Sequence, residues 1–142
     1  MTTIRMPRSL RALAGAALLL AACESPTEPP TVASVAGEYT ATQFDVTTAD
    51  EVIHPLRSGG ELDLTLRADG TTAGRLFLPG MDEDGGDMDA DLAGSWTLRG
   101  DTVRLRHDAD TFLRDVDFIA QGRRLEATHA FGDARVRLTL RK

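Results

Sequence analysis

The fold is decided by residues 92–107, which read LAGSWTLRGDTVRLRH. Apolar and polar side chains alternate on both sides of a central Gly100. Alternation with a period of two is typical of antiparallel strands that turn one face to a core and the other to water. Glycine supplies the positive φ that a tight turn requires. The stretch therefore predicts a β-hairpin centred on Gly100.

The same alternation recurs along most of the chain after residue 35, and no stretch there keeps a helical period over three turns. Phe44 and Val46 fall out of phase with Tyr39 and Ala41, which predicts a bulge near Thr42. We expect eight strands, at residues 37–46, 60–67, 71–79, 92–99, 102–107, 112–119, 123–130 and 134–141.

Eight short strands joined mostly by hairpins favour an all-β, antiparallel, up-and-down eight-stranded barrel, because closure removes unpaired strand edges. A two-sheet sandwich is the alternative. A barrel of this size is either filled by its own side chains or holds one small ligand, and the sequence leaves both open. If there is a ligand cavity, we expect it to be lined by Leu64, Leu76, Trp96, Leu105, Phe118 and Leu138.

Composition excludes several classes of protein. The chain has 142 residues, which indicates one domain, and a single cysteine. It therefore lacks the thiolates for an internal disulfide, a multi-cysteine zinc site or an iron–sulfur cluster. Its formal net charge of −6 argues against a nucleic-acid partner, because such binding relies on Lys and Arg at phosphates.

Residues 1–22 have the pattern of a secretory signal peptide, with Arg5, Arg8 and Arg11 before a short apolar run. The run is shorter than the ~20 residues that a spanning helix needs. It ends in Leu20-Ala21-Ala22-Cys23, which resembles the lipobox of bacterial lipoproteins. The resemblance implies cleavage before Cys23 and acylation of Cys23. An ordinary signal peptide with a chance cysteine is the alternative.

Residues 23–34 contain three prolines among small polar residues, which predicts a flexible tether before a domain at 35–142. The chain from Cys23 onward has 13 basic and 22 acidic residues, a net charge of −9, so we expect acyl chains to hold it at the membrane. Glu24 follows the cysteine, whereas an Asp there would resemble an inner-membrane retention signal. We therefore expect the protein to be anchored in the outer membrane of a cell envelope, on its periplasmic side or on its outer side.

Three motifs resemble those of lipocalin-like domains in bacterial lipoproteins. GEY at residues 37–39 looks like the GxW or GxY entry of such domains. LTLRADGT at residues 64–71 looks like their L-x-L-x-x-D-G-T hairpin, and GSWTLRGDTV at residues 94–103 looks like G-x-W-x-L-x-G-D-T-[VI]. The resemblance covers about residues 35–142 and implies a small lipocalin-like barrel.

The sequence contains no GxSxG, HExxH, Walker or GxGxxG motif, so we expect a protein that is not an enzyme and has no cofactor. The leading hypothesis is a monomeric envelope lipoprotein that binds a small apolar molecule or a lipid. The alternative is a protein-interaction module with a filled barrel, such as an inhibitor or an accessory of envelope assembly. A third hypothesis is a hydrolase whose site residues are scattered along the sequence.

Strand directions in an up-and-down barrel place connections 47–59, 80–91, 108–111 and 131–133 at one rim. This rim would hold all three histidines and the acidic stretch between Met81 and Asp91. Carboxylates suit calcium, and imidazoles beside carboxylates suit a transition metal. One hypothesis is thus that this rim binds a cation. The other is that the histidines only line a hydrated barrel end, where water and loop carbonyls satisfy their hydrogen bonds. The candidate ligands are His54, His107, His129, Asp82, Asp84 and Asp87.

Overall fold

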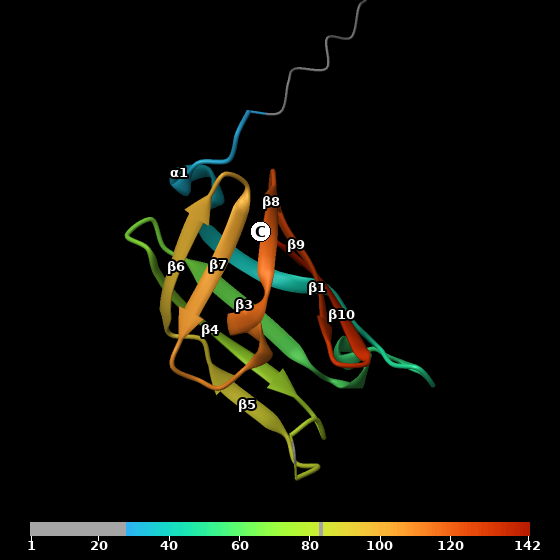
Figure 1. The fold of residues 1–142 in the computed structure, drawn as a ribbon. Helices are drawn as coiled ribbons and strands as arrows, with labels where there is room; N and C mark the ends of the chain where they lie inside the picture. The colour runs from blue at the N-terminus through green and yellow to red at the C-terminus, as the bar shows by residue number, and fades with distance from the viewer. Residues whose placement is uncertain (1–27, 83) are drawn as a thin grey trace, which may run out of the picture.

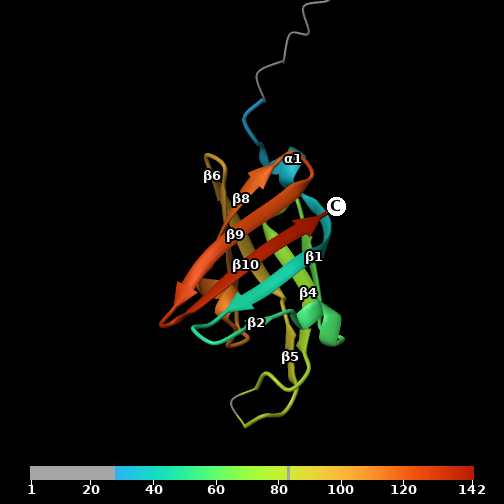
Figure 2. The same cartoon turned by 90° about the vertical axis from the view of Figure 1, so that its right-hand side faces the viewer.

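The computed structural model describes residues 28–82 and 84–142, which form a β-barrel (Figures 1 and 2). Residue 28 and Lys142 lie at the same end of it. The elements are α1 (Val32–Val35), β1 (Gly37–Thr47), β2 (Val52–Ile53), η1 (Pro55–Ser58), β3 (Glu61–Leu66), β4 (Thr71–Leu78), β5 (Met88–Asp91), β6 (Gly94–Arg99), β7 (Thr102–His107), η2 (Phe112–Asp115), β8 (Asp117–Gln121), β9 (Arg124–Phe131) and β10 (Ala134–Arg141).

Eight strands close the barrel in the order β1-β3-β4-β6-β7-β8-β9-β10, and each is antiparallel to its neighbours. The ring closes where β10 pairs with β1 from Thr40↔Arg141 to Thr47↔Arg135. Two short strands lie outside the ring, β2 beside β1 and β5 beside β4. The prediction of an all-β, eight-stranded antiparallel barrel is confirmed, and the sandwich alternative is not adopted.

The predicted bulge in the first strand is also present. The pairing of β1 with β10 shifts register between Ala41 and Gln43. One extra residue reverses the side-chain alternation, so Phe44 points into the core although it is five positions from Tyr39. The Tyr39 hydroxyl donates a hydrogen bond of 2.6 Å to the Val35 carbonyl, which fixes α1 across the end of the barrel.

The shortest strand pairing in the ring is that between β4 and β6, which share only two residue pairs. Here β4 leaves β6 and pairs instead with β5, and Gly74 lies at the switch with φ +145°. A Cβ on Gly74 would lie 2.1 Å from the Asp63 carbonyl oxygen, and one on Gly94 would lie 2.0 Å from that of Arg106. Only glycine permits such close approach of two backbones.

The sixth predicted strand, 112–119, is wrong in its first half. Residues 112–115 form the 3-10 turn η2, and the strand β8 begins at Asp117. Phe112 and Leu113 are adjacent apolar residues, so the alternation with a period of two fails there. The turn places Leu113 in the buried hydrophobic core. The prediction also missed β2, β5 and η1, and α1 lies in the stretch expected to be a flexible tether.

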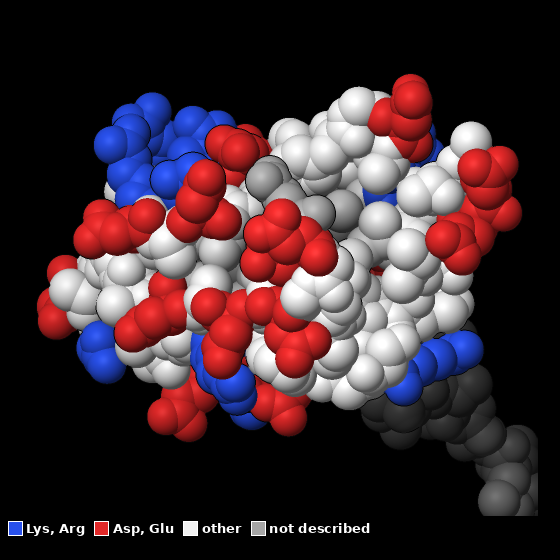
Figure 3. All heavy atoms as spheres, turned by 90° about the horizontal axis from the view of Figure 1, so that it is seen from below, with Lys and Arg blue, Asp and Glu red and all other residues white. Residues whose placement is uncertain are grey.

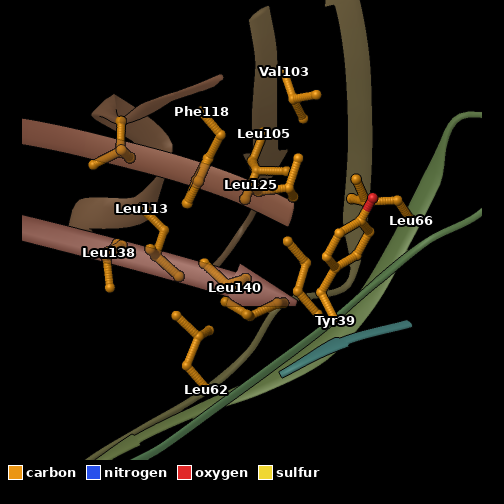
Figure 4. Close-up of a cluster of buried hydrophobic side chains, with 14 of the residues drawn as sticks. Tyr39, Leu62, Leu66, Val103, Leu105, Leu113, Phe118, Leu125, Leu138 and Leu140 are labelled. Atoms are coloured by element: carbon orange, nitrogen blue, oxygen red, sulfur yellow. The ribbon is translucent and has the colours of Figure 1, made fainter. Parts of the chain in front are cut away.

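The interior of the barrel is occupied by one buried hydrophobic cluster made of side chains from every strand of the ring (Figure 4). It is rich in leucine, and Tyr39 and Phe118 are its largest side chains that are almost completely buried. Trp96 covers the cluster near the β3–β4 turn, where its indole Nε1 donates a 2.8 Å hydrogen bond to the Arg67 carbonyl. No buried side-chain nitrogen or oxygen among the described residues lacks a hydrogen-bond partner.

The two ends of the barrel differ in kind. The hairpin rim, as we call the end with α1 and Lys142, has the tight turns at Gly70, Gly100 and Gly122 (Figure 1). The opposite end, which we call the loop rim, consists of the segments 48–60, 79–93, 108–116 and 132–133 (Figure 2). The predicted separation of short turns from long connections is therefore present.

Candidate functional site

The six side chains that the sequence offered as a ligand-cavity lining belong to the core. Their exposed fractions are 0–2%, except for Trp96 at 5%. All six are members of the single buried cluster, in which they pack against one another and their neighbours. The residues concerned are Leu64, Leu76, Trp96, Leu105, Phe118 and Leu138.

The hollows described on the molecule lie on its surface and have other linings. The first, of about 470 Å³, lies between the end of β1 and the β9–β10 hairpin and is lined by Asp45, Arg135 and Arg137 among others. A second, of about 540 Å³, lies on the outer face of the β6–β7 hairpin. None of the five hollows described in residues 28–82 and 84–142 is lined by any of the six core residues.

The loop rim has an aromatic cluster that connects the core with the surface. The rings of Phe44 and Phe112 lie 5.7 Å apart, and Phe131 meets Phe112 edge to face at 5.9 Å. Phe44 is buried, whereas Phe112 and Phe131 are partly exposed. Leu56, Met81 and Met88 also pack against the core while remaining partly exposed. This partly apolar end depends on the bulge in β1, which was predicted, and on η2, which was not.

His107 ends β7 and points inward, as its alternation with Leu105 predicts. It is 7% exposed, and its Nε2 lies 2.7 Å from the Thr111 hydroxyl. Burial lowers the pKa of His107 below its ordinary value, the charge of Arg114 lowers it further, and Asp108 opposes them. His107 is therefore a buried, hydrogen-bonded side chain that favours the neutral imidazole.

His54 lies on the outside of the barrel. Its Nδ1 is 2.7 Å from Asp45 Oδ1, and Gln43 Nε2 donates to Asp45 Oδ2 at 2.7 Å. The Thr139 hydroxyl donates to Gln43 Oε1 at 3.2 Å, which extends the network across the seam between β1 and β10. Hydrogen bonds from Gln43 and then His54 hold the pKa of Asp45 below its ordinary value. Sequence reasoning missed this network because it depends on β2, whose pairing with β1 brings His54 back beside Asp45.

His129 has a third, separate setting, with its ring centroid 4.4 Å from that of Phe131. The three histidines thus lie against different partners: Asp45, Thr111 and Phe131. Among residues 28–82 and 84–142, no group of three or more His, Cys, Asp and Glu side chains could hold a metal ion. The hypothesis of one cation held by His54, His107 and His129 is not supported, because Asp45 retains His54 on the outer wall.

The acidic stretch is partly ordered by its own carboxylates. Residues 88–91 form β5, and Arg75 makes a two-pronged ion pair with Asp89 at 2.8 Å. Asp87 accepts a hydrogen bond from the Gly80 amide, and Asp91 accepts one from the Ala93 amide. Asp82 and Asp84, the other carboxylates proposed for calcium, lie in the turn before β5. This stretch thus forms an acidic β-hairpin with the end of β4.

Cys23, the expected lipidation site, lies outside the described residues. Within them, no helix has both the length and the apolar character to cross a membrane.

Comparison with known proteins yields no relative. No family model matches the chain, and neither a curated protein nor a solved structure matches it. The closed eight-stranded barrel is consistent with the lipocalin-like fold that the motifs at residues 37–39, 64–71 and 94–103 resemble. Function must therefore be inferred from the residues themselves.

Proposed function

We propose that this chain is a non-enzymatic lipoprotein of a bacterial cell envelope, and that its lipocalin-like barrel is a protein-interaction module. The observation that carries the proposal is the burial of the six expected cavity residues, at 0–5% exposure, in one packed cluster. A barrel whose interior is its own hydrophobic core recognises partners through its outer surface. The module is monomeric and requires neither a cofactor nor nucleic acid.

The loop rim is the surface that best suits a protein partner. It combines partly exposed apolar side chains, such as Phe112, Phe131 and Met88, with a dense surround of carboxylates (Figure 3). Transient protein interfaces have this composition, with an apolar centre and a polar edge. The long connections also offer more backbone and side-chain variety than the tight turns of the hairpin rim.

The anchor is proposed at Cys23, on the strength of the resemblance of residues 20–23 to a lipobox. Several acyl chains hold a protein stably at a bilayer, since each buried CH₂ contributes about 0.8 kcal/mol. Glu24 favours the outer membrane over the inner membrane. Acylation also removes a free thiol that would be exposed to an oxidising compartment.

The His54–Asp45 pair supports a structural role rather than catalysis. A hydrolase would need a nucleophile within hydrogen-bond reach of the imidazole. The hydroxyl of Thr48, which lines the hollow beside Asp45, instead caps its own turn by accepting from the Glu51 amide at 3.2 Å. His54 itself does not line that hollow. The pair therefore joins β1 to the segment after β2.

Replacement of Cys23 tests the anchor. In Cys23→Ser we expect the protein to leave the membrane fraction, or to remain uncleaved, because no thiol is present to accept a lipid. Fractionation and mass spectrometry of the N-terminal peptide measure this. A wild-type protein that is soluble and carries no acyl group would contradict the anchor.

Site-specific photo-crosslinking in the native envelope tests the interaction surface. A photoreactive amino acid at Arg57 or Asp84 of the loop rim should crosslink to a protein, because both side chains are exposed there. Thr97, exposed on the outer wall of β6, is the matched control position and should give no such product. Crosslinking at Thr97 alone, or at none of the three positions, would contradict the choice of surface.

A second candidate function is binding of a small apolar ligand or lipid at the loop rim. The aromatic cluster of Phe44, Phe112 and Phe131 favours it, since rings that reach from core to surface can cover an apolar guest. Lipid extraction of the protein purified from its own envelope, with Phe131→Ser as the comparison, distinguishes this candidate. The ligand should be present in the wild type and absent from the variant.

A further inference from the structure

The negative charge of the barrel is concentrated at one end. Within the described residues, the loop-rim segments contain two basic side chains, Arg57 and Arg114, against eleven acidic ones. Figure 3, which looks at the molecule from below, shows many acidic side chains spread across this end. The rest of the described chain has eleven basic and nine acidic side chains. The loop rim therefore accounts for all of the net negative charge. The eleven acidic residues are Asp50, Glu51, Asp82, Asp84, Asp87, Asp89, Asp91, Asp108, Asp110, Asp115 and Asp133.

The hairpin rim contains a patch of four cations. A surface hollow here is lined by Arg123, Arg124, Arg141 and Lys142 together with Gln121. Figure 2 shows the β8–β9 turn and the end of β10 at this end of the barrel. Arg123 donates two hydrogen bonds to the Lys142 backbone carbonyl, at 3.0 and 3.1 Å, which join the β8–β9 turn to the end of β10. Of the four, Arg124 is paired with an acidic side chain, Glu126, at 3.0 Å. We call this group the basic patch.

The chain enters the barrel beside the basic patch. Residues 28–31 and Ser34 line a hollow together with Ala120 and Gly122 of the β8–β9 hairpin. The Lys142 ammonium donates to the carbonyls of Ser34 and Ala36, the second at 3.0 Å. Thr31 and Ser34 form a capping box at α1, which fixes the direction of this segment. The first described residues are therefore bound to the same rim as the four cations.

The distance from the anchor to this rim is short. Glu28 is five positions after Cys23, and a fully extended chain of five residues spans at most about 18 Å. The loop rim lies farther from the anchor by the length of one barrel strand. The eight residues of β9 or β10 extend about 26 Å, or about 20 Å along the axis of a tilted barrel. Because the Debye length is about 8 Å at physiological ionic strength, the acidic rim is screened from a surface that the basic patch touches.

We infer that the barrel stands on the membrane with its basic patch against anionic lipid headgroups and its loop rim pointing away from the bilayer. This inference rests on the anchor proposed at Cys23. Net charge alone predicts repulsion of the whole domain from an anionic surface, but the separation of charge along the barrel converts that repulsion into a preferred orientation. The partner-binding end proposed above is thereby presented to the solvent.

The test anchors the protein chemically, so that it does not depend on acylation in the cell. The chain from Cys23 onward is coupled through its single thiol to a maleimide lipid, in vesicles of phosphatidylcholine with or without phosphatidylglycerol. Amide hydrogen exchange is then followed by mass spectrometry. With phosphatidylglycerol, exchange in the β8–β9 turn at 121–124 should slow by at least about fivefold, since each basic side chain near an anionic surface favours contact by about a factor of five and the patch contains four.

The variant R124Q/R141Q should lose this protection, and added salt should remove it in the wild type. R57Q/R135Q removes the same charge from the other side of the molecule and should retain the protection. Exchange in segment 132–133 should be the same on both kinds of vesicle. Equal exchange of the 121–124 turn with and without phosphatidylglycerol, or protection at the loop rim, would overturn the orientation whether or not the cell acylates Cys23.

Discussion

The hairpin rim and the loop rim are built from the same eight strands, yet they differ in almost every property. At the hairpin rim, turns at Gly70, Gly100 and Gly122 join the strands directly. At the loop rim, the chain makes two extra strands and two 3-10 turns between the same barrel strands. The first end has the basic patch and the second end has the excess of acidic side chains.

This contrast separates what the fold needs from what it is free to vary. Residues in the tight turns and in the core can vary little, because they complete the backbone hydrogen bonds and the side-chain packing of the barrel. The loop rim has partly exposed rings and carboxylates that closure of the barrel does not require. Interaction with a partner is the natural use of such a surface.

Removal of Trp96 should have the largest effect on stability. Trp96→Ala should lower the free energy of unfolding by ~3–5 kcal/mol, because it empties a large buried site and removes one of the two hydrogen bonds that the Arg67 carbonyl accepts. Val52→Ala, at the loop rim, should change it by less than ~0.5 kcal/mol, since Val52 is 51% exposed. Denaturant unfolding of both variants would measure the difference, and similar losses would remove the contrast between core and rim.

A pair of glycine substitutions sharpens the same comparison. Gly94→Ala should lower the free energy of unfolding by ~2–3 kcal/mol, because the new Cβ would lie 2.0 Å from the Arg106 carbonyl oxygen. Gly86→Ala, in the acidic hairpin, should be nearly neutral, since nothing lies within 4 Å of its Cβ position. Thermal unfolding compares the two. A neutral Gly94→Ala would mean that β6 and β7 do not approach so closely at this position.

The eight-stranded ring was predictable from sequence because alternation and turn glycines are local signals. Residues 102–107, for example, form β7 as expected. The loop rim was much less predictable, because its arrangement depends on contacts between distant segments. The setting of His54 is an example, since it follows from the pairing of β2 with β1, which has no local sequence signal. No periodic pattern in the sequence indicates that η2 buries Leu113.

The buried His107 should make stability depend on pH. Its pKa is below the ordinary value of 6.5 in the folded protein, so the unfolded chain binds more protons between the two values. The free energy of unfolding should therefore be greatest above pH 6.5 and fall as the pH decreases through that value. In His107→Gln the decrease should be smaller. Denaturant titrations on both sides of pH 6.5 test this, and equal slopes in the two proteins would refute it.

The ion pair between Arg104 and Asp117 on the barrel wall should have the smallest effect. Its two hydrogen bonds measure 2.7 and 2.8 Å, but both side chains are largely exposed. Arg104 lowers the pKa of Asp117, so the contribution is present above the ordinary aspartate pKa and is lost as the pH falls. A double-mutant cycle with Arg104→Gln and Asp117→Asn should give a small coupling that salt reduces. A coupling as large as the loss in Trp96→Ala would contradict this.

Native mass spectrometry of the protein released from its own membrane tests whether side chains fill the barrel interior and whether Cys23 holds the lipid. We expect the mass of the chain from Cys23 onward plus acyl groups, with no small molecule bound in the barrel. A stoichiometric apolar molecule that is released only when the barrel unfolds would contradict the filled core, and an unmodified Cys23 would contradict the anchor.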